Sequence, residues 1–233
     1  MAEDAFRTAA SGVVPGASER EVAAAFRATL EAYADSGGEP SARAGGFVFC
    51  MSGPDAALAG RAYARTRARL IQPGDLVMVH CNSYLNGMWT DITRTYHPGA
   101  LDDGARPVFD AVLAARRAAL EVIAPGVPAR EVDRAAREVL RRHGFASRFR
   151  HGTGHGVGFA AIDHNARPRL HPASDDVLEA GMVFNVEPAV YLEDKGGVRQ
   201  CELVAVNADG GELLTPFQNR LVELAPRLSA GGH

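Results

Sequence analysis

Four side chains that can bind a metal or transfer a proton follow apolar runs at two separate places in this sequence. His80 ends one run and Asp91 comes eleven residues later, whereas Glu187 ends a second run and Cys201 comes fourteen residues later. Imidazole, carboxylate and thiolate groups are common ligands of transition metals, and imidazole and carboxylate also act as general acids and bases. Each of these residues taken alone could be a buried polar group with a hydrogen-bond partner. Their paired arrangement instead predicts a shared site.

A glycine-rich segment adds two histidines, His151 and His155, and His164 follows it. The segment reads His151-Gly152-Thr153-Gly154-His155-Gly156-Val157-Gly158. Glycines let the backbone approach a ligand closely and adopt positive φ angles, and histidines in such a frame are good ligands and acid/base groups. A phosphate cradle is the alternative, but the Gly-Lys-Ser/Thr signature and the dinucleotide-binding context are missing. Histidine chemistry is therefore the favoured interpretation.

The segments that position these residues occur as two similar copies in the sequence. Residues 70–80 and 178–187 both contain a leucine, then a glycine, then a β-branched apolar run that stops at a polar residue. Upstream of each copy, Pro-Gly is followed after three residues by Arg-Glu-Val, at 15–22 and 125–132. Because side chains alternate along a strand, His80 and Glu187 lie opposite the buried valines of their runs. The duplication predicts two similar halves around one centre.

Helices and strands alternate in blocks along the chain. Ser18 to Glu21 is a capping-box sequence, after which apolar residues recur at helical spacing as far as Tyr33. Further helices are predicted over residues 108–123 and 130–143, and strands over 76–80, 89–96, 182–187 and 198–206. Helices followed by strands, twice over, predict an α+β fold in one domain.

Composition narrows the class of protein. The 233 residues carry a formal net charge of −3, which gives no basic footprint for nucleic acid. No apolar run approaches the ~20 residues that span a bilayer, and the acidic N-terminus does not resemble a signal peptide. Three cysteines are too few for a disulfide framework. We therefore expect a cytoplasmic protein without nucleic-acid or membrane partners.

Four motifs together resemble the pita-bread family, which holds methionine aminopeptidase, Xaa-Pro peptidases and creatinase. They are residues 74–77, 90–95, 151–158 and 181–188, and the resemblance extends from about residue 8 to residue 217. It implies a single pita-bread domain over residues 1–233 with pseudo-symmetric halves, roughly 8–100 and 101–217. The N-terminal domain of the larger relatives is expected to be absent. A homodimer like those relatives is a further expectation.

Family peptidases bind two divalent metals through two Asp, one His and two Glu. Carried over by position, the resemblance implies Asp91, His155 and Glu187 as ligands, whereas His80 replaces the other Asp and Cys201 the other Glu. A histidine that peptidases keep upstream falls on Gly60. The two remaining carboxylates balance one divalent ion, so we expect one Zn, Fe or Mn ion. The alternative is a metal-free site in which a protonated His80 pairs with Asp91 or Glu187.

The predicted activity is cleavage of a C–N or similar bond in a small polar metabolite. His151, His155, His164 and Glu187 are the candidate catalytic residues. Candidate substrate-binding residues are Arg94, Arg199 and Glu202. Whether Cys201 or its neighbour faces the site stays open, because a slip of one residue exchanges the two faces of a strand. One alternative is an Xaa-Pro-type metallo-aminopeptidase that takes short peptides, and another is a binding module without activity.

Overall fold

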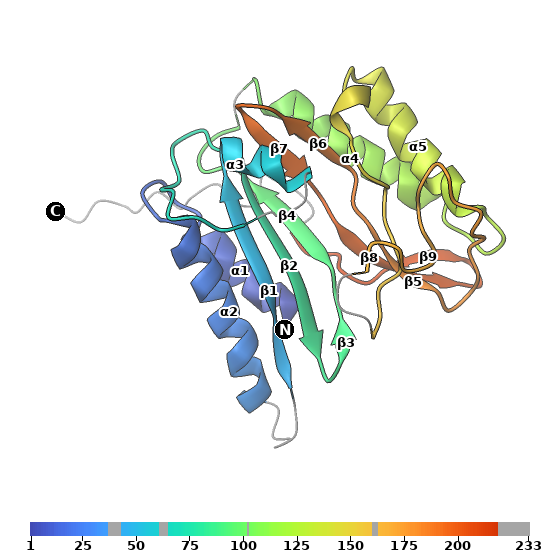
Figure 1. Cartoon of the computed structure of the whole chain (residues 1–233), viewed down its shortest axis with the longest axis horizontal. Coiled ribbons are helices and arrows are strands. Elements are labelled where there is room, and N and C mark those ends of the chain that lie inside the picture. Colours follow the sequence, from blue (N-terminus) through green and yellow to red (C-terminus); the bar gives the residue numbers. More distant parts are fainter. Residues whose placement is uncertain (37–42, 61–64, 102, 160–162, 219–233) are drawn as a thin grey trace.

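Each half of the protein consists of two helices followed by antiparallel strands, as Figure 1 shows. The computed structural model describes residues 1–36, 43–60, 65–101, 103–159 and 163–218. None of the helices in these ranges is long and apolar enough to cross a membrane. The two halves meet where β4 of the first half runs beside residues 199–201 of the second.

The first half packs two helices against a four-stranded sheet. In this sheet β2 pairs with β1, β3 and β4, and all three pairings are antiparallel. Its elements are α1 (Ala2–Gly12), α2 (Glu19–Ser36), β1 (Ala44–Ser52), α3 (Pro54–Ala57), the 3-10 turn η1 (Leu58–Gly60), β2 (Val77–Leu85), β3 (Met88–Trp89) and β4 (Ile92–Tyr96). The predicted capping box forms, since the Ser18 backbone N–H donates to the Glu21 carboxylate at 2.6 Å and the Glu21 N–H donates to Ser18 Oγ at 3.2 Å.

The second half repeats this order with shorter strands. A three-stranded sheet has the order β5-β8-β9, and β6 and β7 form a separate two-stranded ribbon. The elements are α4 (Arg106–Glu121), α5 (Ala129–Arg142), the 3-10 turn η2 (Ala146–Arg148), β5 (Val183–Val186), β6 (Ala189–Leu192), β7 (Gly196–Arg199), β8 (Glu202–Asn207) and β9 (Gly210–Leu213).

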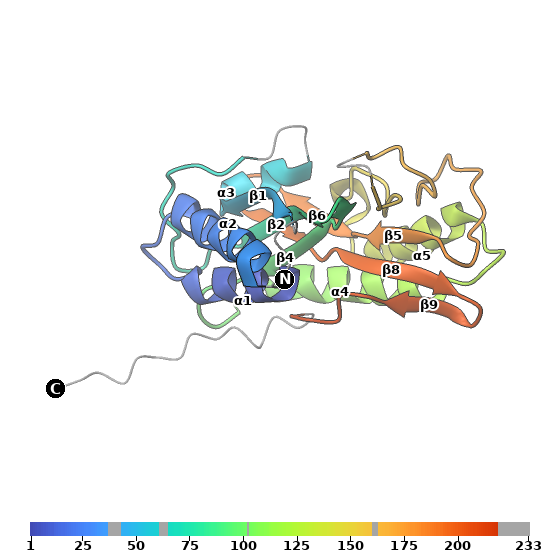
Figure 2. The ribbon, with the colours of Figure 1, turned by 90° about the horizontal axis from the view of Figure 1, so that it is seen from below.

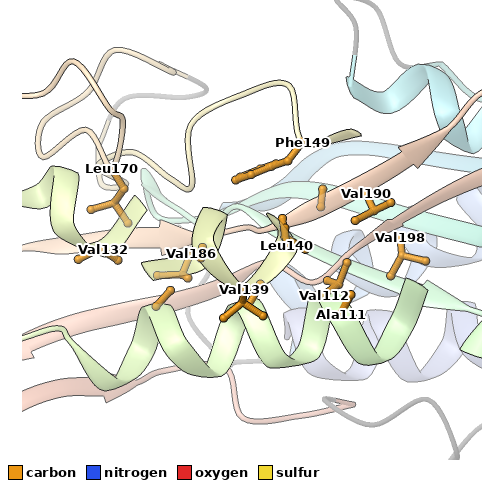
Figure 3. Packing of buried hydrophobic residues seen from close by; sticks show 14 of the residues in the cluster. Ala111, Val112, Val132, Val139, Leu140, Phe149, Leu170, Val186, Val190 and Val198 are labelled. Atoms are coloured by element: carbon orange, nitrogen blue, oxygen red, sulfur yellow. The ribbon is translucent and has the colours of Figure 1, made fainter. Parts of the chain in front are cut away.

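Long helices cover one side of the strands, and the short helix α3 and the long loops lie on the other side. Figure 2 shows α1 and α4 along one side, and α3 with the long loops opposite them. Figure 3 shows Val112 of α4 and Val139 of α5 among strand residues such as Val186 and Val198, and all four belong to the larger of two apolar clusters. The apolar faces of the helices thus pack against the strands, and the candidate site residues lie at or near the ends of these strands.

The predicted elements exist, with two differences. The segment 198–206 is not one strand, because Gln200 and Cys201 interrupt it between β7 and β8. Segment 89–96 is likewise divided into β3 and β4. Sequence patterns also left α1, β1, β6 and β9 unpredicted. The two interruptions fall beside the candidate ligands Asp91 and Cys201.

Candidate metal centre and active-site cavity

A cavity of about 1080 Å³ lies at the junction of the two halves. Most of the predicted site residues contribute to its wall. These residues are His80, Asp91, His151, His155, His164, Glu187 and Arg199. The structure therefore brings together residues from both copies in the sequence and from the glycine-rich segment between them.

Three potential ligands converge here: Asp91 and Glu187 line the cavity, and the fully buried Cys201 lies behind its wall. Ligand atoms of Asp91, Glu187 and Cys201 all lie within 4.8 Å of one another. Asp91 comes directly before β4, Glu187 directly follows β5, and Cys201 directly precedes β8. The backbone N–H of Cys201 donates to the carbonyl of Thr93 at 3.1 Å, which fixes one half against the other at this point. The cluster is thus a product of tertiary contact.

His155 presents one nitrogen to this cluster. Its Nδ1 is 3.0 Å from the Gly156 carbonyl, to which it donates, and its Nε2 lies 3.5 Å from Asp91 Oδ2. Burial lowers the pKa of His155, but the carboxylates of Asp91 and Glu187 outweigh burial and raise this pKa to about 9. With Nδ1–H fixed by the backbone, Nε2 can bind a cation only after it loses its proton and its contact with Asn185 Nδ2 at 3.2 Å.

Glycine is required where the glycine-rich segment passes β5. A Cβ built on Gly154 would lie 1.9 Å from the carbonyl oxygen of Asn185, which no side chain tolerates. The close approach allows the Asn185 backbone N–H to donate to the His155 carbonyl at 3.0 Å, and the Asn185 side chain accepts the His155 N–H at 2.7 Å. The segment therefore lies along β5 like an additional strand, with His155 held over Asp91.

His80 has both ring nitrogens engaged by the protein. Nδ1 lies 3.0 Å from Thr93 Oγ1, and Nε2 lies 3.0 Å from Asn82 Oδ1, an acceptor. Burial and the nearby Arg199 charge lower the pKa of His80 to about 4. This corrects the expectation of a protonated His80 with a raised pKa. A neutral ring that donates from Nε2 and accepts at Nδ1 has no lone pair left for a metal.

The two carboxylates and the thiol of the cluster differ in their acidity. Burial raises the pKa of Glu187 to about 7, in spite of Arg199 at 3.8 Å. Burial also opposes ionisation of Asp91, yet His80 and His155 hold the pKa of this carboxyl well below its usual range. Burial raises the pKa of the Cys201 thiol, which donates to the Asp91 carbonyl at 3.1 Å. Binding a cation at Cys201 would therefore release a proton.

The other two histidines differ in how they face the cavity. His151 donates from Nδ1 to the Gly152 carbonyl and lies with Nε2 2.8 Å from the Tyr191 hydroxyl, and burial lowers its pKa to about 3. His164 is exposed, with Nδ1 3.3 Å from Nε2 of His155. Burial and the neighbouring His155 lower the pKa of His164. Of the two, His164 has the freer ring.

Arg94 and Glu202 lie outside the cavity, which corrects the expectation that they contact substrate. Both side chains are fully buried and paired at 2.8 Å, and Arg116 lies 3.1 Å from the same carboxylate. Arg94 also donates to the carbonyl of Cys201 at 2.6 Å. Since Glu202 is bound on this far side, Cys201 is the residue that faces Asp91. Arg199, by contrast, borders the cavity beside Glu187.

Sequence reasoning overlooked Tyr191, Asn82 and Asn185. Tyr191 occupies the space next to Gly60, where an added Cβ would lie 2.5 Å from the Tyr191 ring. No spacing in the sequence connects these two positions. A signal for Asn185 did exist, because it lies two residues before Glu187 and so shares its strand face.

The fold and the sequence place this chain in a class of metallopeptidases. The model of metallopeptidase family M24 matches residues 1–208, so this chain belongs to family M24. It has the pita-bread fold of this family, as the solved structures of its relatives do.

Individual relatives are similar over nearly the whole chain. The Xaa-Pro dipeptidase of Pyrococcus furiosus is 32% identical over 222 residues, which are 95% of this chain and 60% of that protein. The probable dipeptidase PepE of Mycobacterium tuberculosis is 37% identical over 90% of this chain and 53% of its own length. The solved X-Pro aminopeptidase of Thermotoga maritima has a TM-score of 0.84 at 28% identity, with coverage of 94% and 59%. This chain thus spans little more than half the length of these relatives.

Proposed function

We propose that this chain is a hydrolase that cleaves a C–N bond of short peptide-like substrates and holds one divalent ion. The convergence of Asp91, Glu187 and Cys201 under His155 is the observation that carries the proposal. Relatives with the names dipeptidase and aminopeptidase support the same reaction class. A cavity of about 1080 Å³ is also at the upper end for a small-molecule site, which favours a short peptide over a small metabolite.

The donor set fits one ion better than two. Two carboxylates, one imidazole and one thiolate can surround a single Zn²⁺ or Fe²⁺, for which nitrogen and sulfur donors are well suited. A second ion would require ligands in place of His80, whose nitrogens are held by Thr93 and Asn82. The ion, when bound, would act as a Lewis acid toward a substrate carbonyl.

The surrounding side chains support hydrolysis by orienting charge and moving protons. Arg199, 3.8 Å from Glu187, balances the negative charge of the cluster. His164 lines the cavity, and we assign it the transfer of a proton from the attacking water to the departing amine; its lowered pKa leaves the ring neutral and able to accept that proton first. His151 and Tyr191 contact each other at 2.8 Å, and we assign this pair the positioning of Arg199, which lies 3.4 Å from the Tyr191 hydroxyl.

Metal content and a sulfur-specific spectrum test the proposal. We expect one equivalent of metal in the purified protein, and a thiolate-to-cobalt absorption band after loading with Co²⁺. Cys201→Ser should abolish this band, whereas Cys81→Ser, which changes another buried thiol, should keep it. Two equivalents in the parent protein, or a band that survives Cys201→Ser, would contradict the single-ion site.

Substrate assays separate this proposal from its competitor. The second candidate is cleavage of a C–N bond in a small polar metabolite. It is favoured by the resemblance, which aligns His80 and Cys201 with positions where family peptidases carry carboxylates. Hydrolysis of Xaa-Pro di- and tripeptides by the metal-loaded protein supports the first proposal. If these peptides bind without being cleaved, the chain is a binding module and the proposed hydrolysis is wrong.

A further inference from the structure

Three aromatic side chains form a surface beside the cavity that the proposed chemistry does not use. We call Phe47, Tyr84 and Trp89 the aromatic shelf. The Phe47 and Trp89 rings are stacked, with centroids 5.8 Å apart and an angle of 9° between their planes, and Tyr84 lies 4.8 Å from Trp89. Phe47 is nevertheless 52% exposed. An exposed, preformed stack of this kind is a surface suited to binding another apolar group.

The shelf lies on the same face of the sheet as the cavity wall. Phe47 of β1 is directly opposite Asn82 of β2, and residues that face each other across antiparallel strands project to the same side. Asn82 lines the cavity, as does Phe49, which is stacked on His80 at 5.9 Å. Phe47 lies two residues, or about 7 Å, along the strand from Phe49. The shelf is therefore the outward continuation of the cavity wall.

The strand that carries the shelf also leads to the proposed metal ligands. Trp89 precedes Asp91 by two residues, and the Thr90 N–H between them donates to the Ser83 carbonyl of β2 at 2.7 Å. The pairing of this segment with β2 therefore keeps the same register from β3 to β4. The Cα atoms of Trp89 and Asp91 are consequently about 7 Å apart. That span equals about two residues of an extended peptide, so a substrate at Asp91 reaches the shelf with a neighbouring side chain.

One further residue extends the shelf at its edge. Phe159 is 79% exposed, and its ring lies 3.9 Å from a Cβ built on Gly87 in the turn between β2 and β3. The Trp89 N–H donates to the Gly158 carbonyl at 2.9 Å, which holds this part of the glycine-rich segment against the hairpin. The apolar surface thus runs from β1 across the hairpin to the segment that carries His155.

We infer that the site prefers elongated substrates with an aromatic side chain within two residues of the bond that is cleaved. The inference rests on the proposed hydrolase function and specifies its substrate class. Aromatic rings recognise apolar, flat groups through offset stacking, and the three shelf residues carry no charge that would recognise a polar metabolite.

Trp89 is the sole tryptophan of the chain, so its fluorescence reports on the shelf directly. We would titrate the protein with Ala-Pro-Ala, Ala-Pro-Phe and Phe-Pro-Ala and follow Trp89 emission. At least one phenylalanine peptide should bind about tenfold more tightly than Ala-Pro-Ala and shift the emission to shorter wavelength. Phe47→Ser should remove this preference. Met88→Ser is the matched control, because Met88 is 49% exposed on the same hairpin but is opposite Leu85, on the other face.

The outcomes distinguish this inference from the proposed function. Equal affinities for the three peptides would overturn the inference, even if all three are hydrolysed. Tighter binding of a phenylalanine peptide without hydrolysis would support the role of the aromatic shelf and contradict the proposed hydrolase function. Sedimentation measured without peptide gives one further outcome. If the protein self-associates and Phe47→Ser dissociates it, the shelf is an interface between copies and the inference is wrong.

Discussion

At the scale of single residues, the hydrogen-bond partners decide which of the candidate ligands is available. His155 and His80 are both buried imidazoles near Asp91. His155 donates from Nδ1 to a backbone carbonyl and has Nε2 3.5 Å from Asp91 and 3.2 Å from Asn185 Nδ2, whereas both His80 nitrogens contact the side chains of Thr93 and Asn82. Of the two imidazoles, His155 is the one that we propose as a ligand.

Carboxylates in place of His80 and Cys201 should create a site for a second metal. In His80→Asp with Cys201→Glu, two carboxylates are added beside Asp91 and Glu187, so the charge of the cluster can balance two divalent ions. We expect the metal content to rise from one to two equivalents by elemental analysis. The control is the uncharged pair His80→Asn with Cys201→Gln, which should bind no second ion. If the carboxylate variant stays at one equivalent, these positions do not correspond to the family ligands.

At the scale of elements, each ligand depends on the end of a strand or on a segment held against one. The helices set these ends indirectly, because α2 packs on the sheet that contains β2 and β4. The capping box fixes where α2 begins, and Ser18 also forms a β-bridge with Leu70, just ahead of the turn into β2. The start of this helix and the path into the site strand are thus joined.

Removal of the cap should cost stability without altering the metal centre. Ser18→Ala leaves the Glu21 N–H at the start of α2 without its side-chain acceptor, so we expect a loss of about 1 kcal/mol in the free energy of unfolding. Urea unfolding followed by circular dichroism measures it. Ser11→Ala at the end of α1, where the hydroxyl only donates to the Thr8 carbonyl, should change this free energy less. An equal loss in both variants would contradict a specific role for the capping box.

At the scale of the whole molecule, Arg94 connects the two halves behind the site. It comes from β4 of the first half and contacts Glu202, together with the carbonyls of Cys201, Thr215 and Phe217. Its side chain is 0% exposed. The ion pair sits directly behind the cluster and keeps the Cys201 backbone in place. Stability and site geometry therefore depend on the same guanidinium.

Arg94→Ala should destabilise the whole molecule. It removes one partner of a buried ion pair and leaves four buried oxygen acceptors with fewer donors, so we expect a loss of about 3–5 kcal/mol. The urea concentration at the midpoint of unfolding should fall, whether unfolding is followed by circular dichroism or by Trp89 fluorescence. Arg117→Ala, an exposed arginine on α4, is the control and should change the unfolding free energy by less than about 0.5 kcal/mol. A small effect of Arg94→Ala would show that the halves are held together elsewhere.

Cys201 and Glu202 are a place where the sequence alone could not select which side chain faces the site. Their motif predicts that one of the two faces the site, but the segment is not a regular strand, so alternation could not select between them. Arg94 and Arg116 on the far side take Glu202 and leave Cys201 for the cluster. Arg94 itself was predicted to bind substrate, because a sequence does not show that an arginine has a buried partner 108 residues away.

The sequence by itself determined the α+β class, the two repeated blocks, the start of α2 and the residues from which the site is built. These features follow from periodicity, caps and motifs, which act over a few neighbouring residues. Only the tertiary structure decided that both nitrogens of His80 have side-chain partners, that Cys201 rather than Glu202 joins Asp91, and that the rings of Phe47 and Trp89 stack. Each of these depends on desolvation or on contacts between distant segments, and neither is encoded in local spacing.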